Sequence, residues 1–362
     1  MAFLRNLFNK TNTIEDKYED FWRWFADNEK AFHKVVKSRK NIEKLFFDKL
    51  SPKLNGVRSE VFYLTGMFDN NTVELILTAD GAVKNIVFVE ELINTAPSIP
   101  GWKFTALKPA SAEGFSLNMA GYNFNSDNLS FYANEDARYP DEIDLTIVYD
   151  HYKEDDRTTI TNGVYIFLDN YLGELELATT IDNLVITGQE EATRELIPLT
   201  KLKAFLNWRE KEFTEKHEGT RHHTDSDNHS ILRATLENGK PLFAAVNTDL
   251  LKWDAKASHP WILDVEMKFE GDDNGMPDKP TLTMLEGVED KMLEELKDSD
   301  GFLHIGRETA NNTRNIYFAC QDFRKAAKLT DHILASYKGN GKITYEIYKD
   351  KYWQSFNRFV IH

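Results

Sequence analysis

From Trp261 onward, segments with the two-residue period of a strand and segments with the spacing of a helix follow one another along the chain. Few folds are compatible with their order. The run WILDVEMKF (261–269) alternates apolar and polar side chains, which is typical of a half-buried strand. Residues 281–298 have helical spacing of apolar residues, at Leu282, Leu285, Val288, Met292 and Leu296. Two strands, a helix and a last strand are then predicted at 301–308, 314–321, 323–337 and 342–350. The order β-α-β-β-α-β predicts a ferredoxin-like domain over residues 259–362.

The first 188 residues have a second α+β pattern with leading helices. Aromatic residues at helical spacing, among them Trp22, Trp24, Phe25 and Phe32, are expected to pack against the sheet that follows. That sheet starts with the β-rich runs 60–68 and 72–80 and continues with strands that alternate with helical segments at 81–97 and 163–179. This alternation predicts an antiparallel sheet with its helices on one face.

A connector is expected between the two domains, over residues 189–258. It contains a helix that Pro198 can start, a polar histidine-rich loop and a hairpin that turns at Asn238-Gly239. The predicted fold class is therefore α+β, with two antiparallel α/β-sandwich domains (1–188 and 259–362) joined by a helix and hairpin connector.

Several short motifs in the C-terminal part occur in a characteristic order. They are Gly275-Met276-Pro277-Asp278, Leu285-Glu286-Gly287-Val288-Glu289-Asp290, Gly306-Arg307-Glu308-Thr309, Arg314-Asn315-Ile316-Tyr317-Phe318 and the run from Tyr345 to Trp353. Together they resemble the uncharacterised bacterial family called domain of unknown function 695, over about residues 259–359. The resemblance implies no activity and no catalytic residues. Some relatives are fused to a domain like the regulator of ribonuclease E activity B, which implies regulation through protein binding.

The charge balance indicates which classes of binding partner are favoured. The formal net charge is −15, which disfavours nucleic acid, whose phosphates require Lys and Arg, and favours a protein partner with a basic surface. No apolar run is long enough to span a membrane, and residues 1–13 lack the features of a secretory signal. Cys320 is the single cysteine, so no disulfide can form within the chain. These features predict a cytoplasmic protein without a membrane partner.

Arg307 and Arg314 flank the turn of the C-terminal hairpin and are the leading candidates for a binding site. Two guanidinium groups there can clamp a carboxylate or a phosphate, and Tyr317 and Trp353 are assigned to the same candidate site. The alternative is ordinary ion pairing of the arginines with Glu308, Glu289 or Asp290.

The stretch HEGTRHHTDSDNH (217–229) contains four of the ten histidines. A metal site formed by His222, His223 and Asp225 is one interpretation, but the segment has no cysteine and no HExxH helix. An exposed polar loop between two elements is the favoured interpretation, and no cofactor is predicted.

No local enzyme signature occurs in the sequence: GxSxG, GxxxxGK[ST] and GxGxxG are all missing. The leading hypothesis is a non-enzymatic binding or regulatory protein that acts through protein–protein contacts. The alternatives are a hydrolase or metal-dependent enzyme with its site between the domains, and an RNA-binding module.

Overall fold

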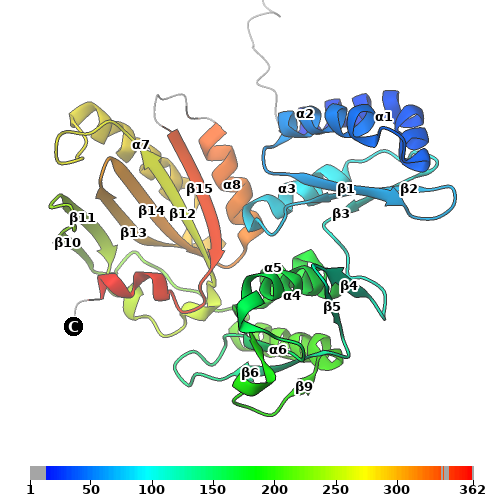
Figure 1. Ribbon diagram of the computed structural model, residues 1–362. Coiled ribbons are helices and arrows are strands. Elements are labelled where there is room, and N and C mark those ends of the chain that lie inside the picture. The colour runs from blue at the N-terminus through cyan, green and yellow to red at the C-terminus, as the bar shows by residue number, and fades with distance from the viewer. Residues whose placement is uncertain (1–13, 336, 338–341, 361–362) are drawn as a thin grey trace, which may run out of the picture. The chain divides into compact units, whose positions relative to one another are not determined.

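A computed structural model of the chain describes residues 14–335, 337 and 342–360 (Figure 1). The chain divides into two compact units, one with residues up to 111 and 169–175, the other with residues 112–168 and 176 onward. Both contain helices and β-sheets, so the predicted α+β class is confirmed. The expectation that residues 1–13 carry no secretory signal lies outside the described residues. No helix in the described ranges is both long and apolar enough to cross a bilayer.

The first unit is built on a three-stranded sheet in the order β1-β2-β3. Its elements are α1 (Ile14–Ser38), a π-helical turn (Glu43–Phe47), α2 (Asp48–Val57), β1 (Phe62–Met67), β2 (Val73–Thr78), α3 (Val83–Asn94) and β3 (Trp102–Ala106). The ring centroids of Phe25 and Trp102 lie 4.9 Å apart, so α1 packs on the sheet. Trp22, Phe25 and Phe32 are buried as predicted, whereas Trp24 is half-buried.

The second unit begins with a small sheet in the order β8-β7-β6-β9 and a separate hairpin, β4-β5. Its elements are β4 (Ser116–Met119), β5 (Tyr122–Asn125), β6 (Leu129–Asn134), β7 (Asp144–Tyr149), α4 (Arg157–Leu172), α5 (Glu174–Thr180), β8 (Asn183–Gly188), β9 (Ile197–Pro198) and α6 (Leu202–His217). The ring of Phe205 on α6 lies 5.6 Å from that of Phe131 on β6, so this helix packs on the sheet.

The prediction of a wholly antiparallel N-terminal region is wrong at two strand pairs. Strands β2 and β3 are parallel, and so are β7 and β8. In each case helices connect the two strands, α3 in the first and α4 with α5 in the second. A helical crossover returns the chain in its original direction, whereas a tight turn would reverse it. One ββαβ arrangement therefore occurs twice.

The C-terminal part of the second unit contains a six-stranded sheet in the order β10-β11-β13-β14-β12-β15. Its elements are β10 (His229–Thr235), β11 (Pro241–Asn247), β12 (Trp261–Lys268), α7 (Lys279–Glu295), β13 (Phe302–Ala310), β14 (Thr313–Cys320), α8 (Phe323–Ala335) and β15 (Lys342–Lys349). From β12 on, the elements follow the predicted order β-α-β-β-α-β, and all neighbouring strands are antiparallel. The hairpin assigned to the connector, β10-β11, extends this sheet by pairing with β13.

The two faces of the C-terminal sheet are covered differently. On one face Trp261 packs on Phe323 of α8 and Arg307 contacts Glu289 of α7. On the other, an apolar cluster that includes Ile262, Tyr317 and Trp353 is closed by the turn Gln354–Phe359. Both faces of the central strands are therefore buried.

Strand β13 contains a β-bulge between His304 and Gly306. His304 pairs with Phe318 and Arg307 with Ile316, so both side chains point toward the helix-covered face although they are three residues apart. Gly306 has φ +150°, and a Cβ there would collide with the carbonyl oxygen of Ala245. A bulge changes which face the following side chains point to, and this one places Arg307 over α7.

Candidate functional site

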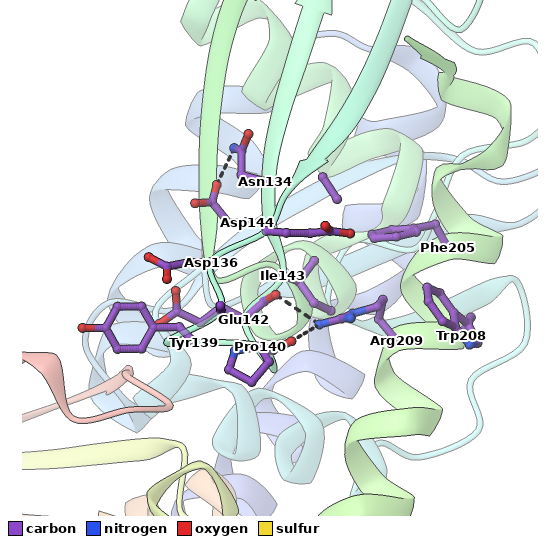
Figure 2. Close-up of a pocket in the computed structure, with 13 residues that line it drawn as sticks. Asn134, Asp136, Tyr139, Pro140, Glu142, Ile143, Asp144, Phe205, Trp208 and Arg209 are labelled. Atoms are coloured by element: carbon purple, nitrogen blue, oxygen red, sulfur yellow. Dashed lines mark hydrogen bonds between the residues drawn. The ribbon is translucent and has the colours of Figure 1, made fainter. Parts of the chain in front are cut away.

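A pocket of about 450 Å³ lies where the loop between β6 and β7 faces α6 (Figure 2). Figure 2 shows Phe205, Trp208 and Arg209 extending from the helix, with residues of the loop and of the strand ends on the opposite side. The acidic residues of the lining are Glu135, Asp136, Glu142 and Asp144. Arg209 is the one basic lining residue, so the wall is acidic overall.

Three aromatic rings also line the pocket. Trp208 is 56% exposed, which is unusual for so large an apolar side chain, and its ring lies 6.0 Å from that of Phe205. Tyr139 lines the loop side. Exposed aromatic faces beside carboxylates attract a cation, because the π-electron face and the carboxylates are both negative.

Arg209 links α6 to the loop between β6 and β7 through hydrogen bonds. Its Nη2 donates to the carbonyl oxygen of Pro140 at 2.7 Å and to that of Glu142 at 3.3 Å. Further along α6, Lys216 and His217 both contact the carboxylate of Asp141, at 2.8 and 3.2 Å. These contacts hold the two walls of the pocket together.

The carboxyl groups of the pocket have different pKa values. Burial raises the pKa of Glu142 to about 7, and the nearby Asp182 and Asp350 add to the effect. The hydrogen bonds and charge of Arg138 lower the pKa of Asp136 to about 2. Asp144 accepts a hydrogen bond from Asn134 at 2.9 Å. The pocket therefore becomes more negative as the pH rises through 7.

The predicted arginines lie elsewhere, on the helix-covered face of the C-terminal sheet. Arg307 Nη1 donates to Glu289 Oε1 at 2.6 Å, and Arg314 Nη1 lies 3.8 Å from Glu289 Oε2. Arg314 is only 5% exposed and Glu289 only 2%, whereas the Arg307 side chain is 37% exposed. These three residues are here called the Glu289 cluster. The predicted pairing with Glu289 is present, and both arginines also line a smaller pocket of about 290 Å³.

Tyr317 and Trp353 do not join the arginines. They point to the opposite face of the sheet, where Tyr317 donates to Glu308 at 2.7 Å and Trp353 donates to the carbonyl of His259 at 2.9 Å. Both are buried, at 4% and 1% exposure. The four predicted binding residues are thus divided between two faces.

The histidine-rich loop is anchored to the domain that follows it. His222 Nε2 contacts Asp227 at 2.9 Å, while His223 and Asp225 are exposed. Thr224 donates to Asp298 through its backbone N–H and its hydroxyl group, at 2.7 and 2.8 Å. Across residues 14–335, 337 and 342–360, no group of three or more His, Cys, Asp or Glu side chains is arranged to hold a metal ion.

The second unit is thus an α+β unit with an acidic aromatic pocket and a C-terminal sheet on which Arg307 and the buried Arg314 share one carboxylate. Residues 230–361 match the family of unknown function DUF695, so this part of the chain is a DUF695 domain and the predicted resemblance is confirmed. The match starts within β10 and includes the hairpin that pairs with β13. No curated protein and no solved structure matches the chain.

Neither Phe205 nor Trp208 stands out in the sequence, because apolar residues on a helix usually pack into a core. The acidic loop carried a weak signal: NEDARYPDEID (134–144) contains five acidic residues, Glu135, Asp136, Asp141, Glu142 and Asp144. Only the fold brings the two segments together.

Proposed function

We propose that this chain is a non-enzymatic binding protein that holds a basic side chain of a protein partner in the acidic aromatic pocket. The observation that carries the proposal is the exposed Trp208, which lines the same pocket as four acidic residues. A guanidinium or ammonium group placed there gains from the aromatic faces and from the carboxylates. The net charge of −15 would attract such a partner from a distance.

Two further proposals accompany this one. The strand order β15-β12-β14-β13 with two helices on one face supports a ferredoxin-like assignment for the DUF695 domain. A cytoplasmic location is supported by the single cysteine, Cys320, which is buried and free.

N-acetylarginine methylamide and its neutral isostere N-acetylcitrulline methylamide test the function. Binding is measured by isothermal titration, which reads the affinity equally in variants that lack the Trp208 ring. We expect the arginine probe to bind and the citrulline probe to bind at least tenfold more weakly. Trp208→Ala should weaken binding about 2- to 30-fold, the range of a cation–π contact. Equal binding of both probes would contradict the proposal.

A matched control separates pocket charge from overall charge. Asp144→Asn and Asp127→Asn each remove one carboxylate, but Asp127 is exposed and outside the pocket. Only Asp144→Asn should reduce arginine affinity. Affinity should also rise from pH 6 to pH 8, because Glu142, with its pKa of about 7, ionises in this range.

One observation favours a hydrolytic function as the second candidate. Glu142 and Asp136 line the same pocket with pKa values of about 7 and about 2, and such a separation is typical of a general acid beside an ionised carboxylate. Hydrolysis of aryl glycosides that disappears in Glu142→Gln would support this candidate. No comparable observation favours RNA binding, since Tyr317 and Trp353 are buried and offer no ring on which a base can stack.

A further inference from the structure

The smaller pocket, of about 290 Å³, lies on the helix-covered face of the C-terminal sheet, where β10 and β11 extend the sheet. It has a polar end and an apolar end. Arg307, Thr309 and Arg314 form the polar end. Ile231, Phe243 and Leu282 are among the apolar lining residues.

Strand register explains why these side chains meet. Ile231 pairs with Ala245 and Ala245 with Arg307, which forms one row across three strands. Phe243 pairs with Thr309 and Thr309 with Arg314, which forms the next row. Side chains in register point to the same face, so apolar groups on the hairpin continue directly into the arginine pair.

The apolar end is open to solvent. Ile231 is 82% exposed and Phe243 is 38% exposed. Exposed apolar side chains next to a concave surface are a common mark of a ligand site.

The polar end has hydrogen-bonding capacity that the protein does not use. Glu289 Oε1 accepts from Arg307, whereas Arg314 Nη1 and Glu289 Oε2 have no hydrogen-bond partner although both are buried. The Arg314 side chain is 6% exposed, and its Nε donates to Thr309 at 3.0 Å. A buried guanidinium that is only partly hydrogen-bonded costs free energy, which a bound anion would recover.

The charge of the Glu289 cluster indicates which anion fits. Arg307 and Arg314 are both cationic, and Glu289 supplies one negative charge. The nearby His304 is neutral at physiological pH, because burial lowers its pKa to about 4. Two positive charges and one negative charge leave +1, which a single monoanion neutralises. Glu286 also acts on Arg314, but it is exposed to solvent, where its charge is screened.

We infer that this pocket binds a small organic monocarboxylate with an apolar tail, the carboxylate on Arg307 and Arg314 and the tail on Ile231 and Phe243. A carboxylate matches the planar fork of a guanidinium and carries the single charge that the cluster lacks. A phosphate dianion would leave excess negative charge beside Glu289. The carboxylate can belong to a free acid or to the C-terminus of a peptide that ends in an apolar residue.

Isothermal titration with hexanoate tests the inference. Three ligands serve for comparison. Hexanamide has the same tail without a charge, hexylamine has the opposite charge, and inorganic phosphate has no tail. We expect hexanoate to bind at least tenfold more tightly than each of these. Equal binding of hexanamide would overturn the inference, and so would tighter binding of phosphate. An N-acetylated tripeptide ending in leucine, with a free or an amidated C-terminus, distinguishes the two sources of carboxylate. The free acid is the source if hexanoate binds and neither peptide does.

Two variants test whether hexanoate binds in this pocket. Arg307→Gln should weaken hexanoate binding about 10- to 100-fold, as expected for loss of a hydrogen bond to a charged group. Phe243→Asp should abolish it, and since Phe243 is partly exposed the fold should persist. Arg358→Gln is the matched control, because Arg358 contacts Glu308 and Tyr317 on the opposite face of the same sheet. Equal losses in Arg307→Gln and Arg358→Gln would overturn the assignment.

Discussion

Two groups of charged side chains in the second unit each surround a buried carboxylate, but they are hydrogen-bonded to different extents. One is the Glu289 cluster. The other, here called the Asp182 cluster, joins Asp182 to Lys349 and Lys351, at 3.0 and 2.8 Å. Both contain a carboxylate between two cations, and in both the carboxylate is buried.

The clusters differ in how completely they are hydrogen-bonded. Asp182 also accepts from the backbone N–H of Ile143, Lys351 donates to the carbonyl of Asp141, and Lys349 donates to the carbonyls of Thr179 and Thr180. In the Glu289 cluster two buried atoms lack a hydrogen-bond partner, Glu289 Oε2 and Arg314 Nη1, and so does Nε2 of the neighbouring His304. A complete network stabilises the fold, whereas an incomplete one keeps capacity for a ligand.

The largest effect is expected from breaking the complete cluster. Asp182→Ala leaves two lysines without their carboxylate, and removal of one partner from a buried ion pair costs about 3–5 kcal/mol. Urea unfolding should show this loss of stability in the second unit. Asp127→Ala, at an exposed site, should change stability by less than about 0.5 kcal/mol. A loss below about 1 kcal/mol in Asp182→Ala would show that the cluster is not a stabilising contact.

A smaller loss is expected from the incomplete cluster, together with a change in binding. Glu289→Gln keeps the shape of the side chain but removes its charge, and a hydrogen bond to a charged group is worth about 1.5–3 kcal/mol. The pocket charge would rise from +1 to +2, so affinity for inorganic phosphate should increase while the urea midpoint falls. Unchanged phosphate affinity would mean that Glu289 does not set the charge preference of the pocket.

The last effect is absent at neutral pH and develops only as the pH falls. Burial lowers the pKa of His304 to about 4 from its ordinary value of 6.5. The unfolded chain therefore takes up a proton below pH 6.5 that the folded chain refuses until about pH 4, and stability falls as the pH drops through this window. His304→Gln should flatten the pH dependence of the melting temperature between pH 6.5 and 4, whereas His332→Gln, at an exposed site, should leave it unchanged.

The sequence predicts the C-terminal element order well, because the alternation in 261–269 and the helical spacing in 281–298 are strong local signals. It does not predict the parallel pairs β2/β3 and β7/β8, since strand direction depends on how a helix carries the chain back. The acidic pocket escapes prediction for a similar reason: Trp208 and Glu142 are far apart in the chain, and only the packing of α6 brings their surfaces together.

The sequence predicts the arginine pair and includes Glu289 among its three candidate partners, but it does not predict which side chains are buried around the pair. Tyr317 follows Arg314 by three residues in the sequence, and alternation along β14 therefore places the two side chains on opposite faces. Glu289 was one of several acidic residues on a helix, and nothing local marked it as the buried one. Burial of a charge is decided by tertiary packing, which single-residue patterns do not record.

The bulge at His304–Gly306 inverts the parity of strand β13. Before it, the even-numbered His304 points toward α7; after it, the odd-numbered Arg307 and Thr309 do. The arginine pocket therefore depends on the count of residues in the strand as much as on their chemistry. A regular strand that kept all of these residues without the bulge would turn Arg307 toward the face that holds Tyr317, with every ligand-facing side chain still present in the sequence.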